Sequence, residues 1–141
     1  MSRVNIYTSQ PEAYNAMFIL EDYIKNCGLS PILEELIRVR TSQINGCAYC
    51  IELHTKAALK NGETHKRLFS LTAWKESPLF SSEERAVFAL IEEITHISNN
   101  GVCDATYNQL AEYFEEAQIA QLIMLVSVMN VWNRMAVATK V

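Results

Sequence analysis

The chain has 141 residues, of which half are hydrophobic and a fifth are charged, and its formal net charge is -4 at pH 7. This length and balance are typical of one globular domain, expected to span residues 1–141, and argue against disorder. No run of Lys or Arg could neutralise a row of phosphates or hold an anionic membrane, so we expect neither nucleic acid nor a membrane as a partner.

Helix-breaking residues are scarce, with four Gly and three Pro, and no segment alternates with the period of a strand. We therefore expect an all-α, single-domain bundle of about six to seven helices. The first helix is expected from Pro11, which a first helical turn tolerates, to near Gly28, which suits a left-handed cap. Its expected inner face consists of Phe18, Ile19, Tyr23 and Ile24.

The next two helices are expected to meet at Gly46. Ser30-Pro31 opens the second helix, with Glu34 and Glu35 in the first turns, where the helix dipole favours negative charge. The third helix is expected to start around residue 47 and to end at residues 61–62, another C-terminal stop signal. The apolar stripe of the second helix is Leu33, Leu36, Ile37 and Ile44.

The second half of the chain contains further helix signals. A short helical segment is expected over residues 66–73, followed by a connector at residues 77–80 and a capping box that starts at Ser81 and opens a helix ending before Asn99. Asp104 is a candidate cap for a short helix. The final helix, about residues 116–140, is apolar on nearly all sides and is expected in the centre of the bundle or in a subunit interface.

We expect a cytoplasmic protein. The first residues lack the apolar core of a signal peptide, and the most apolar stretch, residues 119–131, is interrupted by polar residues and shorter than the roughly 20 residues that span a bilayer. Thiols in the cytoplasm are normally kept reduced. The four cysteines therefore indicate reactive or metal-binding sites before a structural disulfide framework.

Cys47, Cys50 and His54 follow one another at spacings of three and four residues, so on a helix they share a narrow stripe. A helix start stabilises a thiolate, and a Cys-X-X-Cys pair there can close a disulfide with little backbone movement. We expect a Cys47–Cys50 disulfide on mild oxidation, with Cys27 and Cys103 left as thiols packed in the interior.

Zinc is the competing use of this motif, because a bare Cys-X-X-Cys is as typical of metal binding as of redox chemistry. Seven residues of helix rise roughly 10 Å, however, which strains one metal between Cys47 and His54. A fourth ligand would have to come from Glu35, His65 or His96, and none of these lies in a second Cys/His cluster.

Glu35 differs from its neighbour Glu34. Glu34 has Arg38 at i+4, which predicts an ordinary surface ion pair, whereas Glu35 shares its stripe with Ile32 and Val39. The pattern leaves open whether Glu35 is a solvated acid at the edge or a buried functional one. Polar Asn130, Asn133 and Arg134 on the apolar last helix favour an internal or intersubunit hydrogen-bond network over substrate contact, and Trp74 and Trp132 are expected to be core or interface anchors.

The array Glu35, Cys47-Ala48-Tyr49-Cys50, His54 resembles the core motif of the alkylhydroperoxidase D-like branch of the carboxymuconolactone decarboxylase family. The similarity continues in residues 73–80, 82–86 and 130–134 and so covers most of the chain. It implies an all-helical, oligomeric peroxidase without a cofactor or bound metal, in which Cys50 attacks the peroxide, Cys47 resolves it, and His54 and Glu35 relay protons.

The resemblance also implies two partners, a hydroperoxide substrate and an external dithiol or redox protein as electron donor. One departure from the family motif is Tyr49, which stands where the best-studied members have a second His. A non-catalytic thiol-disulfide adaptor or redox sensor remains the alternative function. A lactone decarboxylase is a further alternative, although that reaction needs no thiol pair.

Overall fold

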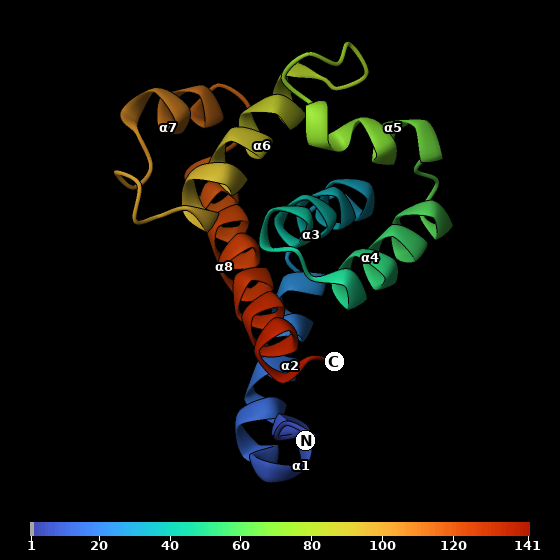
Figure 1. The fold of residues 1–141 in the computed structure, drawn as a ribbon. Helices are drawn as coiled ribbons and strands as arrows, with labels where there is room; N and C mark the ends of the chain where they lie inside the picture. Colours follow the sequence, from blue (N-terminus) through green and yellow to red (C-terminus); the bar gives the residue numbers. More distant parts are fainter. Residues whose placement is uncertain (1) are drawn as a thin grey trace.

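The computed structural model describes residues 2–141, and throughout this range the chain forms helices and connecting loops without a strand (Figure 1). The expected all-α bundle is therefore confirmed. The helices are α1 (Ile6–Ser9), α2 (Pro11–Lys25), α3 (Pro31–Asn45), α4 (Ala48–Lys60), α5 (His65–Ser70), α6 (Ser82–Thr95), α7 (Asp104–Ala111) and α8 (Glu116–Thr139), with a 3-10 turn, η1 (Leu71–Ala73), after α5.

Most helix boundaries follow from local capping. Pro11 and Pro31 occupy first helical turns, and Ser81 closes the predicted capping box with Glu84 at the start of α6. Gly46 ends α3 in the left-handed conformation, with φ of 65°, and so turns the chain directly into α4. Helix α1 was not predicted. The Asn5 side chain caps it by accepting the Thr8 backbone N–H.

The core forms around α3, which packs against α4, α6 and α8. Leu36, Ile37, Leu122, Leu125 and Phe88 are completely buried there. Helix α8 also packs against α2 and α7, which confirms the expectation of a central helix.

The length argument against a membrane span does not hold for the whole of α8. This helix has 24 residues and is long and apolar enough to cross a membrane. In the structure, however, its buried face belongs to the bundle core, and that face includes Ile119, Val126 and Met129. Packing between helices therefore accounts for the apolar residues on this face of α8.

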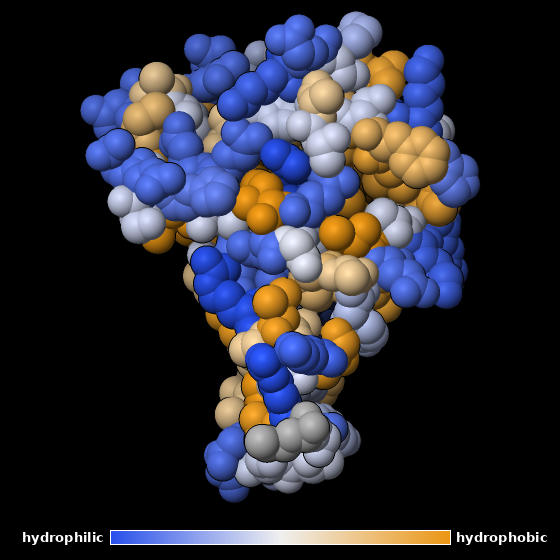
Figure 2. Space-filling model, in the orientation of Figure 1, coloured by the Kyte–Doolittle hydropathy of each residue, from blue (hydrophilic) through white to orange (hydrophobic). Residues whose placement is uncertain are grey.

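The predicted inner face of α2 is wrong for three of its four residues. Ile24 is buried, whereas Phe18, Ile19 and Tyr23 are exposed to 47%, 73% and 51%. Helix α2 packs along the C-terminal part of α8, and together with α1 these helices form the narrow end of the molecule, where both termini lie (Figure 1). Apolar and charged side chains are interspersed on this surface (Figure 2).

The expectation of interior packing is wrong for Cys103, which is exposed, while Cys27 is half-buried. Cys103 is the N-cap residue of α7, and Asp104, the predicted cap, is the first residue of that helix. The Cys103 thiol lies 3.3 Å from a carboxylate oxygen of Glu93. A helix start on the surface thus overrides the general tendency of free cysteines to be buried.

Candidate functional site

Cys47 and Cys50 form a disulfide at the start of α4, and Cys27 and Cys103 are free thiols, as predicted. Cys47 is the N-cap residue, and its sulfur accepts the Cys50 backbone N–H at 3.3 Å. The Cα atoms of the pair are 5.3 Å apart, within the usual range for a disulfide. A dithiol–disulfide couple can therefore operate here with both Cα atoms in place.

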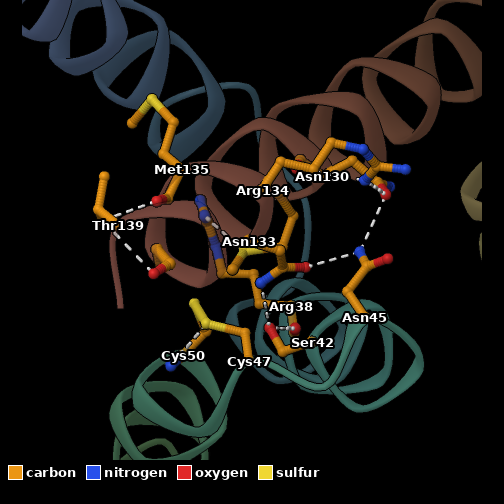
Figure 3. The surroundings of a disulfide bond; sticks show 12 residues. Arg38, Ser42, Asn45, Cys47, Cys50, Asn130, Asn133, Arg134, Met135 and Thr139 are labelled. Carbon is orange, nitrogen blue, oxygen red and sulfur yellow. Dashed lines mark hydrogen bonds between the residues drawn. A yellow bond between two sulfur atoms is a disulfide. The ribbon is translucent and has the colours of Figure 1, made fainter. Parts of the chain in front are cut away.

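The disulfide lies in a small apolar cluster between α4 and α8. Cys47 and Cys50 are only 2% and 4% exposed, and they pack with Met129, Trp132 and Ala136 of α8. Figure 3 shows the two cysteines at the start of α4. Apolar surroundings keep bulk water from the sulfur atoms. Access to them is therefore decided by the cavity that opens beside Cys50.

His54 and Glu35 meet across the packed faces of α3 and α4. Glu35 Oε2 lies 2.9 Å from His54 Nδ1, and both side chains are 14% exposed. The solvated alternative for Glu35 is thus excluded. When Glu35 is ionised, the imidazole Nδ1–H donates to it and Nε2 is left as a proton acceptor, one helical turn beyond Cys50.

Arg38 is the main feature of the site that sequence reasoning missed. Its two terminal nitrogens donate to both carboxylate oxygens of Glu21, at 3.0 and 2.7 Å, and one of them also donates to Glu34 at 3.1 Å. The predicted Glu34–Arg38 pair exists, but it is not a surface pair, because Arg38 is only 4% exposed. The other nitrogen lies 3.9 Å from the Met129 sulfur.

The charges in this cluster stabilise one another. Burial alone would raise the pKa of Glu21, but the hydrogen bonds and charge of Arg38 and a 2.7 Å hydrogen bond from the Trp132 indole hold that pKa below its usual value. Burial opposes the charge of Arg38, yet Glu21 and Glu34 raise its pKa. Glu21 and Arg38 are therefore both ionised at neutral pH.

A cavity of about 900 Å³ joins these groups. Cys50 lines it and Cys47 does not, while His54, Glu35, Glu21 and Arg38 contribute to its walls. Tyr49, the departure from the family motif, also lies in the wall and is half exposed. Further lining residues are the aromatic side chains of Tyr7, Tyr14, Phe18 and Trp132.

The polar residues of α8 form the predicted internal network. Asn45 of α3 donates to both Asn130 and Asn133 at 3.0 Å, and Asn133 donates to Ser42 at 3.0 Å (Figure 3). Asn130 also accepts a hydrogen bond from Arg134. These contacts hold α8 against α3 beside the disulfide.

Of the two tryptophans, Trp74 is a buried core residue and Trp132 a half-buried residue of the cavity wall. Among residues 2–141, no three His, Cys, Asp or Glu side chains are grouped in a way that could hold a metal ion. The His54 ring nitrogen Nδ1 is directed to Glu35 instead.

The sequence model of the carboxymuconolactone decarboxylase family matches residues 11–93. This chain belongs to that family. The match runs from α2 to α6 and includes Glu35, Cys47, Cys50 and His54, but not α8. The uncharacterized protein YdfG of Bacillus subtilis is 40% identical over 136 residues, which cover 96% of this chain and 92% of the relative. The uncharacterized protein YnjA of Escherichia coli is 30% identical over 111 residues, covering 78% of this chain and 60% of the relative.

Solved structures share the fold. A crystal structure of an Agrobacterium tumefaciens protein of unknown function, described as an antioxidant defence protein AhpD, matches with a TM-score of 0.95 at 31% identity and covers 99% of this chain and 96% of that one. The debrominase Bmp8 in complex with 2,3,4-tribromopyrrole matches with a TM-score of 0.83 at 17% identity, covering 94% of this chain and 71% of that one. The alkylhydroperoxidase D-like fold is thereby established.

Proposed function

We propose that this protein is a thiol-dependent peroxidase that reduces organic hydroperoxides through Cys50 and Cys47. The observation that carries the proposal is the asymmetry of the disulfide: Cys50 faces the cavity, with the His54–Glu35 pair one helical turn away, and Cys47 lies behind it. A substrate that enters the cavity meets Cys50 first. A role in peroxide removal also fits the similar Agrobacterium protein, which is provisionally described as an antioxidant defence protein.

The proposed cycle starts from the dithiol. The Cys50 thiolate attacks the terminal oxygen of the hydroperoxide, the O–O bond breaks, and the alcohol leaves with a proton supplied through His54 and Glu35. Cys50 is then a sulfenic acid. The Cys47 thiol attacks its sulfur, and water leaves as the disulfide forms. An external dithiol must reduce this disulfide, and the cytoplasm is the compartment that supplies such donors.

Stopped-flow oxidation of the reduced protein by an organic hydroperoxide tests the activity. We expect rapid loss of two thiols per chain in the wild type and none through this route in Cys50→Ser. Cys103→Ser is the matched control, because Cys103 is an exposed thiol outside the cavity, and it should react as the wild type does. If the disulfide is reduced by a dithiol partner but the reduced protein does not react with hydroperoxides, the protein is a thiol-disulfide adaptor or a redox sensor instead.

The proton relay is tested separately. His54→Ala and Glu35→Gln should each slow the reaction, since general acid–base help is typically worth ~10²- to 10⁴-fold. Glu34→Gln is unsuitable as a control because Glu34 contacts buried Arg38. Glu52→Gln on α4 is suitable, since Glu52 is exposed and lies outside the cavity. Equal rates for the Glu35 and Glu52 variants would remove Glu35 from the site.

We also propose that the protein self-associates, because α2 leaves Ile19 and Tyr23 on the surface, outside the cavity. Burial of such apolar area is the usual driving force for homo-oligomers. Light scattering at micromolar concentration should give a mass above that of one 16.0 kDa chain. A monomer would contradict this expectation without bearing on the peroxidase activity.

A further inference from the structure

The cavity beside Cys50 is far larger than a peroxide group. Its volume of about 900 Å³ lies in the range of pockets that enclose drug-sized molecules. One wall is aromatic, with the Tyr14 ring 5.3 Å from Phe18 and 5.2 Å from Trp132 in edge-on contacts. Phe18 is 47% exposed, so its ring retains free surface that a substrate can cover. The wall therefore suits a substrate that carries a ring or a comparably bulky apolar group.

The charges around the cavity are predominantly negative. Within residues 2–141, the lining includes four carboxylates, those of Glu21, Asp22, Glu34 and Glu35, against two permanent cations, Lys25 and Arg38. Carboxylates remain in excess even with His54 protonated. Walls of one sign in a cleft of low dielectric raise the energy of a like-charged ligand.

Arg38 offsets part of this negative charge, but it offers no free hydrogen-bonding edge to an anionic substrate. Both terminal nitrogens of its guanidinium are occupied, by the two oxygens of Glu21 and by Glu34. The paired N–H donors that would bind a substrate carboxylate are thus already bound to carboxylates of the protein. Lys25 and Asp22 are both exposed, so water screens both charges, and the carboxylates of Glu21, Glu34 and Glu35 still outnumber Arg38.

We propose that this cavity selects uncharged hydroperoxides with an aromatic or similarly bulky apolar group and rejects anionic ones. The inference rests on the proposed peroxidase function. In that reaction one hydroperoxide and two thiols give one alcohol, one water and one disulfide, so the organic group passes through unchanged. Selection therefore acts on the binding of that group, through the rings of Phe18, Tyr14 and Trp132 and through the carboxylates.

Two matched substrates test the charge filter on the wild-type protein. Cumene hydroperoxide and its 4-carboxy derivative have the same ring and the same reacting group. Single-turnover oxidation of the reduced protein at low ionic strength should be at least ~10-fold faster with the neutral compound. Added salt should bring the rates with the neutral and carboxylated compounds closer together. Glu34→Gln should also reduce the difference between the two rates, by accelerating the reaction of the carboxylated compound.

The aromatic wall is tested with tert-butyl hydroperoxide, which lacks the ring. Wild type should favour cumene hydroperoxide over it, and Phe18→Ala should reduce this preference. Since Phe18 is largely exposed, the variant is expected to fold. Phe69→Ala is the matched control, because Phe69 is 78% exposed on α5 and lies outside the cavity, and it should leave both substrate ratios unchanged.

The outcomes separate the two proposals. Equal rates for cumene hydroperoxide and its carboxylated derivative would overturn the charge filter while leaving the peroxidase activity in place. An unchanged ring preference in Phe18→Ala would overturn the role of the aromatic wall. Failure of all three hydroperoxides to oxidise Cys47 and Cys50 would overturn the peroxidase function itself.

Discussion

Two clusters of the same composition lie on opposite sides of α3. In one, Arg38 and the Trp132 indole both donate to Glu21. In the other, Arg40 donates to Glu92 at 3.1 Å and the Trp74 indole donates to the same oxygen at 2.9 Å. Two residues along a helix correspond to a rotation of roughly 200°, so Arg38 and Arg40 leave α3 in opposite directions.

The surroundings give these clusters different roles. Arg38 is 4% exposed, binds a second carboxylate, Glu34, lines the cavity, and contacts the Met129 side chain that packs on the disulfide. The Glu92 cluster instead includes Lys75, whose side chain is 67% exposed. The two carboxylates are equally exposed, Glu21 to 24% and Glu92 to 25%, so the clusters differ in their cations and their place. Buried Arg38 lines the cavity, whereas Arg40 and exposed Lys75 hold Glu92 outside it.

The largest expected difference between the clusters is in stability. Arg38→Met leaves Glu21 and Glu34 without their buried partner, and loss of one member of a buried ion pair costs about 3–5 kcal/mol. Arg40→Met should cost about 1 kcal/mol, because Glu92 keeps a cation, Lys75, whereas Glu21 and Glu34 lose the cation that bonds both of them. Urea denaturation of the two variants measures this. Equal losses would mean that burial does not distinguish the clusters.

A smaller effect is expected from the indole hydrogen bonds. Trp132→Phe and Trp74→Phe each remove a hydrogen bond to a charged acceptor, worth about 1.5–3 kcal/mol. Stability should fall in both variants, but only Trp132→Phe should lower the rate of hydroperoxide reduction, because Trp74 lies outside the cavity. Thermal unfolding and stopped-flow oxidation separate the two effects. A slowed reaction in Trp74→Phe would contradict the assignment of the Trp74 cluster to stability alone.

The smallest effect concerns acid stability. For both Glu21 and Glu92, burial would raise the pKa, but in Glu21 Arg38 and Trp132, and in Glu92 Trp74, Lys75 and Arg40, outweigh it and lower the pKa. A lowered folded-state pKa stabilises the fold above the ordinary value of 4.5 and loses that contribution as the pH falls through the lower value. Glu21→Gln and Glu92→Gln should each therefore lose less stability than wild type on acidification below about pH 5.

Chemical denaturation at a series of pH values provides this measurement, with Glu12→Gln as a control that has an exposed carboxylate in the first turn of α2. The free energy of unfolding of the Glu12 variant should fall with decreasing pH as that of wild type does. If the unfolding free energy of Glu21→Gln falls with pH as steeply as that of wild type, protonation of this carboxylate is not linked to unfolding.

Local sequence features determined the helices and the redox pair. Capping residues such as Pro31, Gly46 and Ser81 act within one helical turn. The spacing of Cys50 and His54 places both on one face of α4, and Cys47 is the N-cap residue of that helix. Such signals depend on bonds and contacts between near neighbours in the chain. They can therefore be recognised from the sequence before the fold is known.

The sequence provided only part of the evidence for the role of Glu35. Its apolar neighbours Ile32 and Val39 suggested burial, and the resemblance to a family motif pointed to its role. Nothing local, however, related it to His54, which is 19 residues away on another helix. The pair forms because α3 and α4 pack against each other after the turn at Gly46.

Other features depended on tertiary structure alone. Arg38 stands between buried Ile37 and Val39, a weak sign of burial, but its main partner Glu21 lies 17 residues earlier and the Trp132 that completes the cluster lies 111 residues after Glu21. The outward position of Phe18 and Ile19 likewise follows from the peripheral packing of α2. Helical periodicity defines which side chains share a face, whereas the docking of distant helices decides whether that face meets the core, the cavity or water.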